Sequence, residues 1–88
     1  MKSRALGRFW RLYHALPPDT RRAADNPFSL WRQNPQHRSL HFKRIRHNLW
    51  SVRVNDNYRA LATFDGDTWL WFWIGQHDEY ERLPKYDR

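Results

Sequence analysis

The first third of the chain has the hydrophobic spacing of two helices. From residue 3 to 16, large apolar residues recur every three or four positions, as on one face of a helix: Leu6, Phe9, Trp10, Tyr13 and Leu16. Ser3 is a candidate cap, and Pro17-Pro18 end the helix. The same spacing continues from Asp19 or Thr20 to about residue 33, so a second helix is expected there. Pro27 should kink or split it, because proline removes a backbone hydrogen bond.

From residue 39 the hydrophobic period changes to two, which indicates β-strands. Four strands are predicted, at 39–45, 49–55, 58–64 and 68–75. Asp56-Asn57 and Asp65-Gly66-Asp67 have the composition of tight turns. The last strand is apolar on both faces, since Trp69, Trp71 and Trp73 alternate with Leu70, Phe72 and Ile74. Such a strand is expected at the centre of a sheet, covered on both sides.

A short helical turn is expected after this strand, with Asp78 at its start as the cap and Glu79 at its positively polarised end. The predicted fold class is therefore α+β, a single domain over residues 1–88. An N-terminal helical hairpin packs on a four-stranded antiparallel sheet that is followed by a short C-terminal helix. Residues 1–5 are too polar and too short for a strand, so one sheet edge is expected to stay open.

The amino-acid composition excludes several classes of protein. The chain has no cysteine, which excludes a disulfide framework and a thiolate zinc site. No apolar run reaches the roughly 20 residues of a membrane span, and Arg8, Arg11 and His14 interrupt the apolar residues near the N-terminus. A soluble, cytoplasmic protein without a membrane partner is expected.

Positive charge is concentrated in the first half of the chain. The net charge is +7, and eleven of the 16 Lys and Arg residues lie within residues 1–47, together with only two of the nine acidic residues. Clustered positive charge suits a polyanion, so a nucleic acid or an acidic protein is the expected partner. A generally basic, soluble surface is the alternative.

Two groups of residues are candidates for chemistry. Strand alternation places His41, Lys43, Ser51 and Arg53 on one face of the sheet, where they are either a phosphate-binding surface or ordinary solvated residues. The second group is His77 to Tyr80. Adjacent residues point in different directions, so no metal site is expected. Histidine changes charge near neutral pH and suits acid–base chemistry, and Tyr80 could stack on a base. The local pattern alone favours a capped helix start at this second group. Gly75, at the end of the preceding strand, would allow a close backbone approach or a bend.

Three motifs resemble the RelE/ParE superfamily of toxins from bacterial toxin–antitoxin modules. They are N-P-x-H-x-S-L at 34–40, W-S-V-R-V-x-x-x-Y-R-A-L at 50–61 and W-I-G-x-H-D-E-Y-x-R-L at 73–83. The likeness covers about residues 8–83. RelE-type members cut mRNA in the ribosomal A site without a metal or other cofactor. Members of this superfamily usually begin with an edge strand, which is not expected here, and Ser51 stands where some carry lysine.

The resemblance also implies roles for individual residues. Arg53, Arg59 and His77 match catalytic positions, and Tyr80 is a weaker match to a C-terminal aromatic. The basic residues that would hold the RNA backbone are His41, Lys43, Arg44 and Arg46. The implied partners are the ribosome, mRNA and a cognate antitoxin with an acidic, partly disordered segment, for which an open sheet edge would allow strand addition. Two alternatives stay open: a ParE-type inhibitor of DNA gyrase, and a non-catalytic RNA- or protein-binding module.

Overall fold

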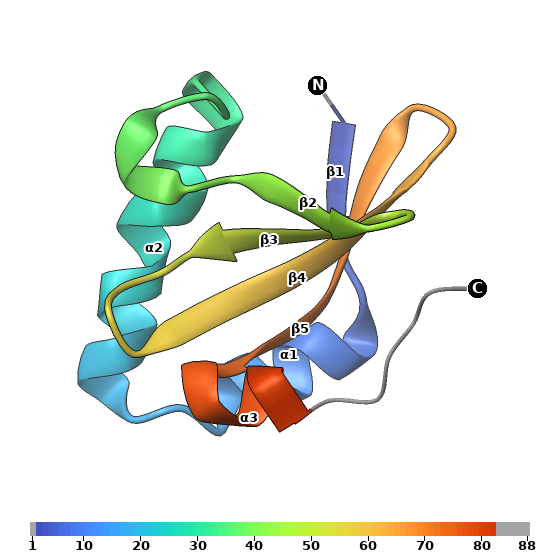
Figure 1. The fold of residues 1–88 in the computed structure, drawn as a ribbon. Coiled ribbons are helices and arrows are strands. Elements are labelled where there is room, and N and C mark those ends of the chain that lie inside the picture. The colour runs from blue at the N-terminus through green and yellow to red at the C-terminus, as the bar shows by residue number, and fades with distance from the viewer. Residues whose placement is uncertain (1, 83–88) are drawn as a thin grey trace.

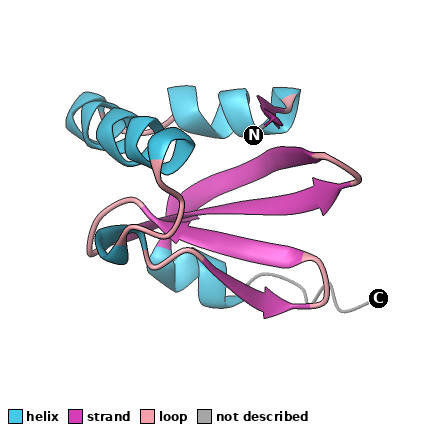
Figure 2. Cartoon of the chain, turned by 90° about the horizontal axis from the view of Figure 1, so that it is seen from above, coloured by secondary structure: helices cyan, strands magenta, loops and turns pink. Residues whose placement is uncertain are grey.

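A computed structural model shows a five-stranded mixed sheet with helices on both faces (Figures 1 and 2). It describes residues 2–82. The elements in chain order are β1 (Lys2–Ala5), α1 (Gly7–His14), α2 (Pro18–Gln33), the 3-10 helix η1 (Arg38–Leu40), β2 (Lys43–Arg46), β3 (Leu49–Arg53), β4 (Tyr58–Asp65), β5 (Thr68–Gln76) and α3 (His77–Arg82). Within the described residues, no helix is long and apolar enough to cross a membrane.

The expected α+β class is confirmed, but the sheet has one strand more than predicted. Its order is β1-β5-β4-β3-β2, and β1 runs parallel to β5 while the other neighbours are antiparallel. The prediction of no strand in residues 1–5 was wrong. An edge strand can be short and polar because one side of it stays in solvent. Lys2 also holds β1 in place, since its Nζ donates a 3.0 Å hydrogen bond to Asp67, in the turn just before β5.

The helical hairpin is present with revised limits. Helix α1 begins at Gly7 rather than at residue 3, so Ser3 lies in β1 and caps nothing. The guanidinium of Arg21 donates to the carbonyl oxygens of His14 (3.0 Å) and Leu16 (3.4 Å), which ties the start of α2 to the end of α1. Helix α2 continues through Pro27 without being split.

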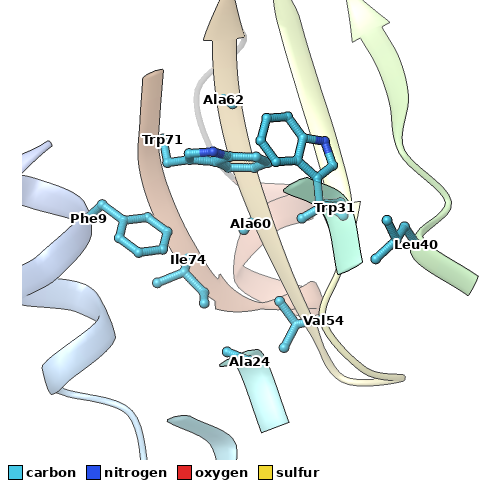
Figure 3. Close-up of a cluster of buried hydrophobic side chains, with 10 residues drawn as sticks. Phe9, Ala24, Trp31, Leu40, Val54, Ala60, Ala62, Trp71 and Ile74 are labelled. Atoms are coloured by element: carbon cyan, nitrogen blue, oxygen red, sulfur yellow. The ribbon is translucent and has the colours of Figure 1, made fainter. Parts of the chain in front are cut away.

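An aromatic cluster joins this hairpin to the sheet (Figure 3). Trp31 of α2 is buried, and its ring meets Trp71 of β5 edge-to-face, with 5.1 Å between centroids. Phe28 meets the same Trp71 at 5.1 Å and Phe9 of α1 at 5.6 Å. Ala60 of β4 is fully buried beneath the cluster and leaves room for these rings. Edge-to-face pairs add about 0.5–1.5 kcal/mol each beyond the area they bury.

Strand β5 is apolar on both faces, as predicted, but it lies between the edge strand β1 and the central strand β4 rather than at the centre of the sheet. Its alternation changes phase once. Leu61 of β4 pairs with Trp73, whereas the next residue, Ala62, pairs with Trp71, so Phe72 is an extra residue on β5. This β-bulge turns Trp71 toward α1 and α2 and Trp73 toward the opposite face, where it packs with Leu49 and Leu61. The regular alternation expected from the sequence had placed both tryptophans on one face.

The face opposite the hairpin is therefore less open than predicted. Helix α3 lies on it (Figure 2), and Ser51, expected among exposed basic residues, is only 3% exposed. Ser51 has apolar neighbours on this face, with Leu61 directly opposite it across the β3–β4 ladder.

Gly75 permits a close approach of side chains within the last strand. A Cβ at this position would lie 2.6 Å from Cζ2 and 2.8 Å from Cη2 of Trp73, and 3.3 Å from a carboxylate oxygen of Glu79. Gly75 stays paired with Arg59 in the ladder, so it is not the bend considered from the sequence.

The cap of α3 also differs from the prediction. Glu79, not Asp78, accepts the hydrogen bond from the backbone N–H of Gln76, at 3.3 Å. A glutamate in the third helical position that reaches back to the residue before the helix is half of a capping box.

We predict that Gly75→Ala destabilises the protein by about 1–3 kcal/mol, because the added methyl group must displace the buried indole of Trp73. Gly7→Ala is the matched control. Its Cβ would come no closer than 3.8 Å to another side chain, so this variant should be unchanged or stabilised by about 0.4–1 kcal/mol. Urea unfolding measures both, and equal midpoints for Gly75→Ala and the parent would contradict the packing described.

We also predict that the pKa of the Asp67 carboxyl depends on the docking of β1 beside β5. The hydrogen bond from Lys2, followed by the one from Thr68, holds the pKa of this carboxyl below its usual value of 3.8. A lowered pKa stabilises the fold above the unfolded-state pKa, and this contribution is lost as the pH falls through the folded-state pKa. In Lys2→Ala the pKa of Asp67 should rise toward its usual value, while Lys43→Ala should leave it unchanged. NMR titration of the Asp67 carboxyl measures this shift. An unchanged Asp67 pKa in Lys2→Ala would contradict the docking of β1 beside β5.

Candidate functional site

The β3–β4 turn organises one end of the sheet. The side-chain oxygen of Asn55 accepts hydrogen bonds from the backbone N–H groups of Asn57 (2.8 Å) and Tyr58 (3.0 Å), as in an Asx-turn. The backbone N–H of His77 then donates to the carbonyl oxygen of Asn57 at 2.7 Å. The start of α3 is therefore fixed beside the turn that joins β3 to β4.

Arg53 and Arg59 face each other across the two strands that this turn connects. They form a directly opposed pair in the β3–β4 ladder, so both side chains leave the same face of the sheet. The guanidinium of Arg53 forms an ion pair with Asp56 in the turn, and the Arg53 side chain keeps 29% exposure. This hydrogen bond and the charge of Arg53 hold the pKa of the Asp56 carboxyl below its usual range.

Arg59 supports the turn as well as contributing positive charge. One of its terminal nitrogens donates to the carbonyl oxygens of Asn55 (2.7 Å) and Tyr58 (2.9 Å). Two charge-assisted bonds to backbone oxygens fix the guanidinium in place. Removing this side chain should therefore affect stability as well as any chemistry at this end of the sheet.

His77 lies at the same end of the sheet, one strand beyond Arg59. Gly75 is the residue directly opposite Arg59 on β5, and His77 follows two positions later as the first residue of α3. His77 is half-buried and lines a hollow of about 330 Å³ together with Asp56, Asn57, Tyr58, Gln76 and Asp78. Asp56 thus connects the hollow to Arg53, through the ion pair between them.

The structure thus brings Arg53, Arg59 and His77 to one end of the sheet. Tyr80 is in α3, but its side chain lies outside the part of the chain that is described. Between residues 2 and 82, no group of three or more His, Asp and Glu side chains is placed to hold a metal ion. The hollow beside His77 is lined by two carboxylates, Asp56 and Asp78, and by neither arginine. A phosphodiester is therefore better matched by the sheet face that carries Arg53 and Arg59, with His77 at the end of the neighbouring strand.

The residues predicted to hold RNA are more dispersed. Lys43 pairs with Ser51 and shares the face of Arg53, but Arg44 pairs with Trp50 and projects toward the hairpin face. Arg46 pairs with Leu49 beyond a bulge, at the far end of β2.

His41 is not in a strand. The stretch 39–45, predicted as one strand, divides between η1 and β2, and His41 between them is exposed with a left-handed backbone (φ 45°). The alternation that placed His41 beside Lys43 therefore does not apply.

Sequence reasoning missed the contribution of the turn residues. Asn55 and Asp56 order the site through an Asx-turn and an ion pair, yet in the sequence Asp56-Asn57 indicated only a tight turn. The available signal was the spacing, because Asp56 lies three residues from both Arg53 and Arg59.

Two solved structures with the same fold are toxin–antitoxin complexes. The RelB–RelE antitoxin–toxin complex from Methanococcus jannaschii matches with a TM-score of 0.70 and 19% identity, over 91% of this chain and 98% of that one. The toxin–antitoxin complex RelBE2 from Mycobacterium tuberculosis matches with a TM-score of 0.68 and 23% identity, over 86% and 96% of the two chains. At these identities the likeness establishes the fold. No curated protein sequence matches the chain.

A sequence family defines the relationship more closely. The family model for the ParE-like toxin domain matches residues 18–82, from the start of α2 to the end of α3. This match covers most of the chain and includes Arg53, Arg59 and His77. The chain therefore belongs to the ParE-like toxin domain family, within the RelE/ParE superfamily of toxins.

Proposed function

We propose that this protein is the toxin of a type II toxin–antitoxin pair and that it cleaves mRNA on the ribosome without a metal ion. The observation that carries the proposal is the opposed pair of Arg53 and Arg59, with His77 at the end of the neighbouring strand. Two guanidiniums on one face suit a phosphate, and histidine can exchange a proton near neutral pH. The antitoxin is proposed from the family and from the complexes that share the fold.

The proposed reaction uses the nucleophile of the RNA itself. The ribose 2′-oxygen attacks the adjacent phosphorus, a 2′-O–P bond forms and the P–O5′ bond breaks. One proton leaves the 2′-hydroxyl and one reaches the 5′-oxygen. The products are a 2′,3′-cyclic phosphate and a 5′-hydroxyl, so atoms and charge balance without an oxidant or another reactant.

His77 acts in this proposal as the general acid or the general base, and Tyr80 stacks on a nucleobase. Arg53 and Arg59 stabilise the charge that develops on the non-bridging phosphate oxygens. Because Asp56 is paired with Arg53 in the free protein, the phosphate must compete with that carboxylate. Lys43, on the same face, extends the positive surface along the RNA backbone.

Inhibition of DNA gyrase is the second candidate, and the family match favours it, since the matched domain is described as ParE-like. In that case the basic residues would contact a protein or DNA surface and nothing would be cut. The bonds from Arg59 to backbone oxygens are compatible with this reading, because they give Arg59 a structural role independent of catalysis.

We predict that His77→Ala and Arg53→Ala slow the shut-off of protein synthesis by at least about tenfold after induced expression in bacteria, because general acid–base and charge stabilisation each contribute that much or more. Pulse labelling of new protein measures this effect. Arg22→Ala is the matched control, since Arg22 is exposed on α2, away from the site, and should leave the shut-off unchanged.

Two results would count against the ribonuclease. One is that both variants stop protein synthesis as fast as the parent. The other is that DNA breaks and filamentation precede any loss of protein synthesis, which would favour gyrase as the target. The effect of Arg59→Ala on protein synthesis can be compared only after the folded fraction of this variant has been measured. The substitution also removes the hydrogen bonds from Arg59 to the carbonyl oxygens of Asn55 and Tyr58.

A further inference from the structure

Four aromatic side chains form a continuous surface on the hairpin face of the sheet. They are Phe42, just before β2, Trp50 of β3, Phe64 of β4 and Trp69 of β5. Ring centroids are 5.2 Å apart for Phe42–Trp50, 5.1 Å for Trp50–Trp69 and 4.7 Å for Phe64–Trp69. The small, buried Ala62 lies opposite Trp50 in the ladder and lets the rings from β3 and β5 meet above β4. We call these four side chains the aromatic platform.

The platform is accessible on one side and held in place on the other. Phe64 is 39% exposed, and the other three side chains are half-buried. The side-chain amide of Asn48 donates to the carbonyl oxygen of Phe64 and accepts from its backbone N–H, both at 2.8 Å. The buried Trp31 meets Phe42 (5.6 Å) and Trp69 (6.0 Å) edge-to-face. Rings that are already fixed lose little freedom when a ligand binds.

The charge beside the platform is positive. Arg44 is directly opposite Trp50 in the β2–β3 ladder, so it shares this face, and it is exposed. Asp65 follows Phe64 in a regular part of the ladder and therefore points to the other face. Asp67 is already bound by Lys2. An anionic partner is therefore favoured here.

The position of the rings within the sheet favours a flat ligand over a peptide. β3, β4 and β5 each have a neighbouring strand on both sides, so their backbone groups cannot accept an added strand. What they offer is ring faces with a guanidinium beside them. Proteins that bind single-stranded nucleic acids use this combination, because bases stack on aromatic rings and cations meet the phosphates. Trp50 belongs to neither core cluster of the described residues, so its ring is not needed to fill the core.

The platform is separate from the end of the sheet that carries Arg53, Arg59 and His77. Arg59 and Phe64 are both on β4, and the five residue steps between them span about 17 Å. Alternation along β4 also puts the two side chains on opposite faces. A base bound at the platform is therefore not one of the two that flank the bond to be cut.

We propose that the aromatic platform stacks on an unpaired nucleobase of RNA, that Arg44 contacts the adjoining phosphate, and that this contact lies outside the cleavage site. The choice of RNA rests on the proposed function, whereas the stacking chemistry does not. The contact also accounts for Arg44, which ladder pairing places on this face rather than beside Lys43 and Arg53.

A titration of the full-length protein labelled with ¹⁵N tests this inference. The probe is an adenosine hexamer with 2′-O-methyl groups, which cannot be cleaved through its 2′-oxygens. The control is an abasic hexamer with the same phosphates. The adenosine hexamer should shift the indole N–H signals of Trp50 and Trp69 but not that of Trp73, which packs on the other face. It should also bind at least about fivefold more tightly than the abasic hexamer, because only the former can stack.

Paired variants separate stacking from general hydrophobic contact. Phe64→Leu keeps an apolar side chain without a ring and should weaken binding of the adenosine hexamer about fivefold or more, whereas Phe64→Tyr should not. Trp10→Leu is the matched control, since Trp10 is the other exposed large hydrophobic residue of the described chain and lies on α1. Its affinity should be unchanged. Amide spectra and urea midpoints confirm that each variant is folded.

Arg44→Ala should weaken binding of the same hexamer and make it less dependent on salt, because one phosphate contact is lost. Arg22→Ala, on α2 and away from the platform, is the control and should bind as the parent does. Equal salt dependence for Arg44→Ala and the parent would contradict the phosphate contact.

Three outcomes would overturn the platform as a base-stacking site. The first is equal affinity for the adenosine and abasic hexamers, and the second is unchanged binding in Phe64→Leu. The third is that the indole signals of Trp50 and Trp69 shift with protein concentration alone, which would identify a contact between two copies of the chain.

The titration contains no ribosome, so its failure can be told apart from failure of the proposed function. Absence of stacking while His77→Ala still slows the shut-off of protein synthesis would reject the platform alone. Stacking on the hexamer while His77→Ala acts as fast as the parent would reject the ribonuclease and leave the platform in place.

Discussion

The structure depends on a strand that must be covered on both faces. β5 carries bulky apolar residues at nearly every position, and the extra residue Phe72 divides them between two layers. Trp71 enters the aromatic cluster under the hairpin, and Trp73 enters the smaller cluster on the other side. A chain of 88 residues has little core to spare, so this double coverage uses α1 and α2 on one face and α3 on the other.

The same strand determines where function can reside. The cluster of Trp73, Leu49 and Leu61 fills the middle of the second face, where Ser51 is buried. Arg53, nearer the β3–β4 turn, keeps 29% side-chain exposure. There the ladder aligns Arg53 with Arg59, and the end of β5 is tied to the turn by the His77–Asn57 backbone bond. On the hairpin face, the aromatic platform lies toward the other end of β4, at Phe64. The two candidate surfaces are therefore on opposite sides of one sheet.

The helices and strands with strong hydrophobic periodicity were predicted well from the sequence. Features that depend on tertiary contacts were not. The apolar spacing predicted α1, α2 and four strands to within a few residues, and Trp69 to Ile74 indicated a strand covered on both faces. The bulge at Phe72 and the strand at Lys2–Ala5 were missed because both depend on the partner strand rather than on local periodicity. At the site, the motifs identified Arg53, Arg59 and His77, which the fold brings to one end. They could not predict that Asp56 pairs with Arg53 or that His41 leaves the strand.

We propose that the end of the sheet that carries Arg53, Arg59 and His77 cuts RNA when the ribosome presents it. The most direct measurement incubates the purified protein with a defined mRNA, with and without ribosomes stalled at a known codon, and determines the new RNA ends. We expect cleavage within the A-site codon only when ribosomes are present, with a 2′,3′-cyclic phosphate and a 5′-hydroxyl at the new ends. Intact mRNA under these conditions, with loss of DNA supercoiling activity when gyrase is supplied instead, would contradict it.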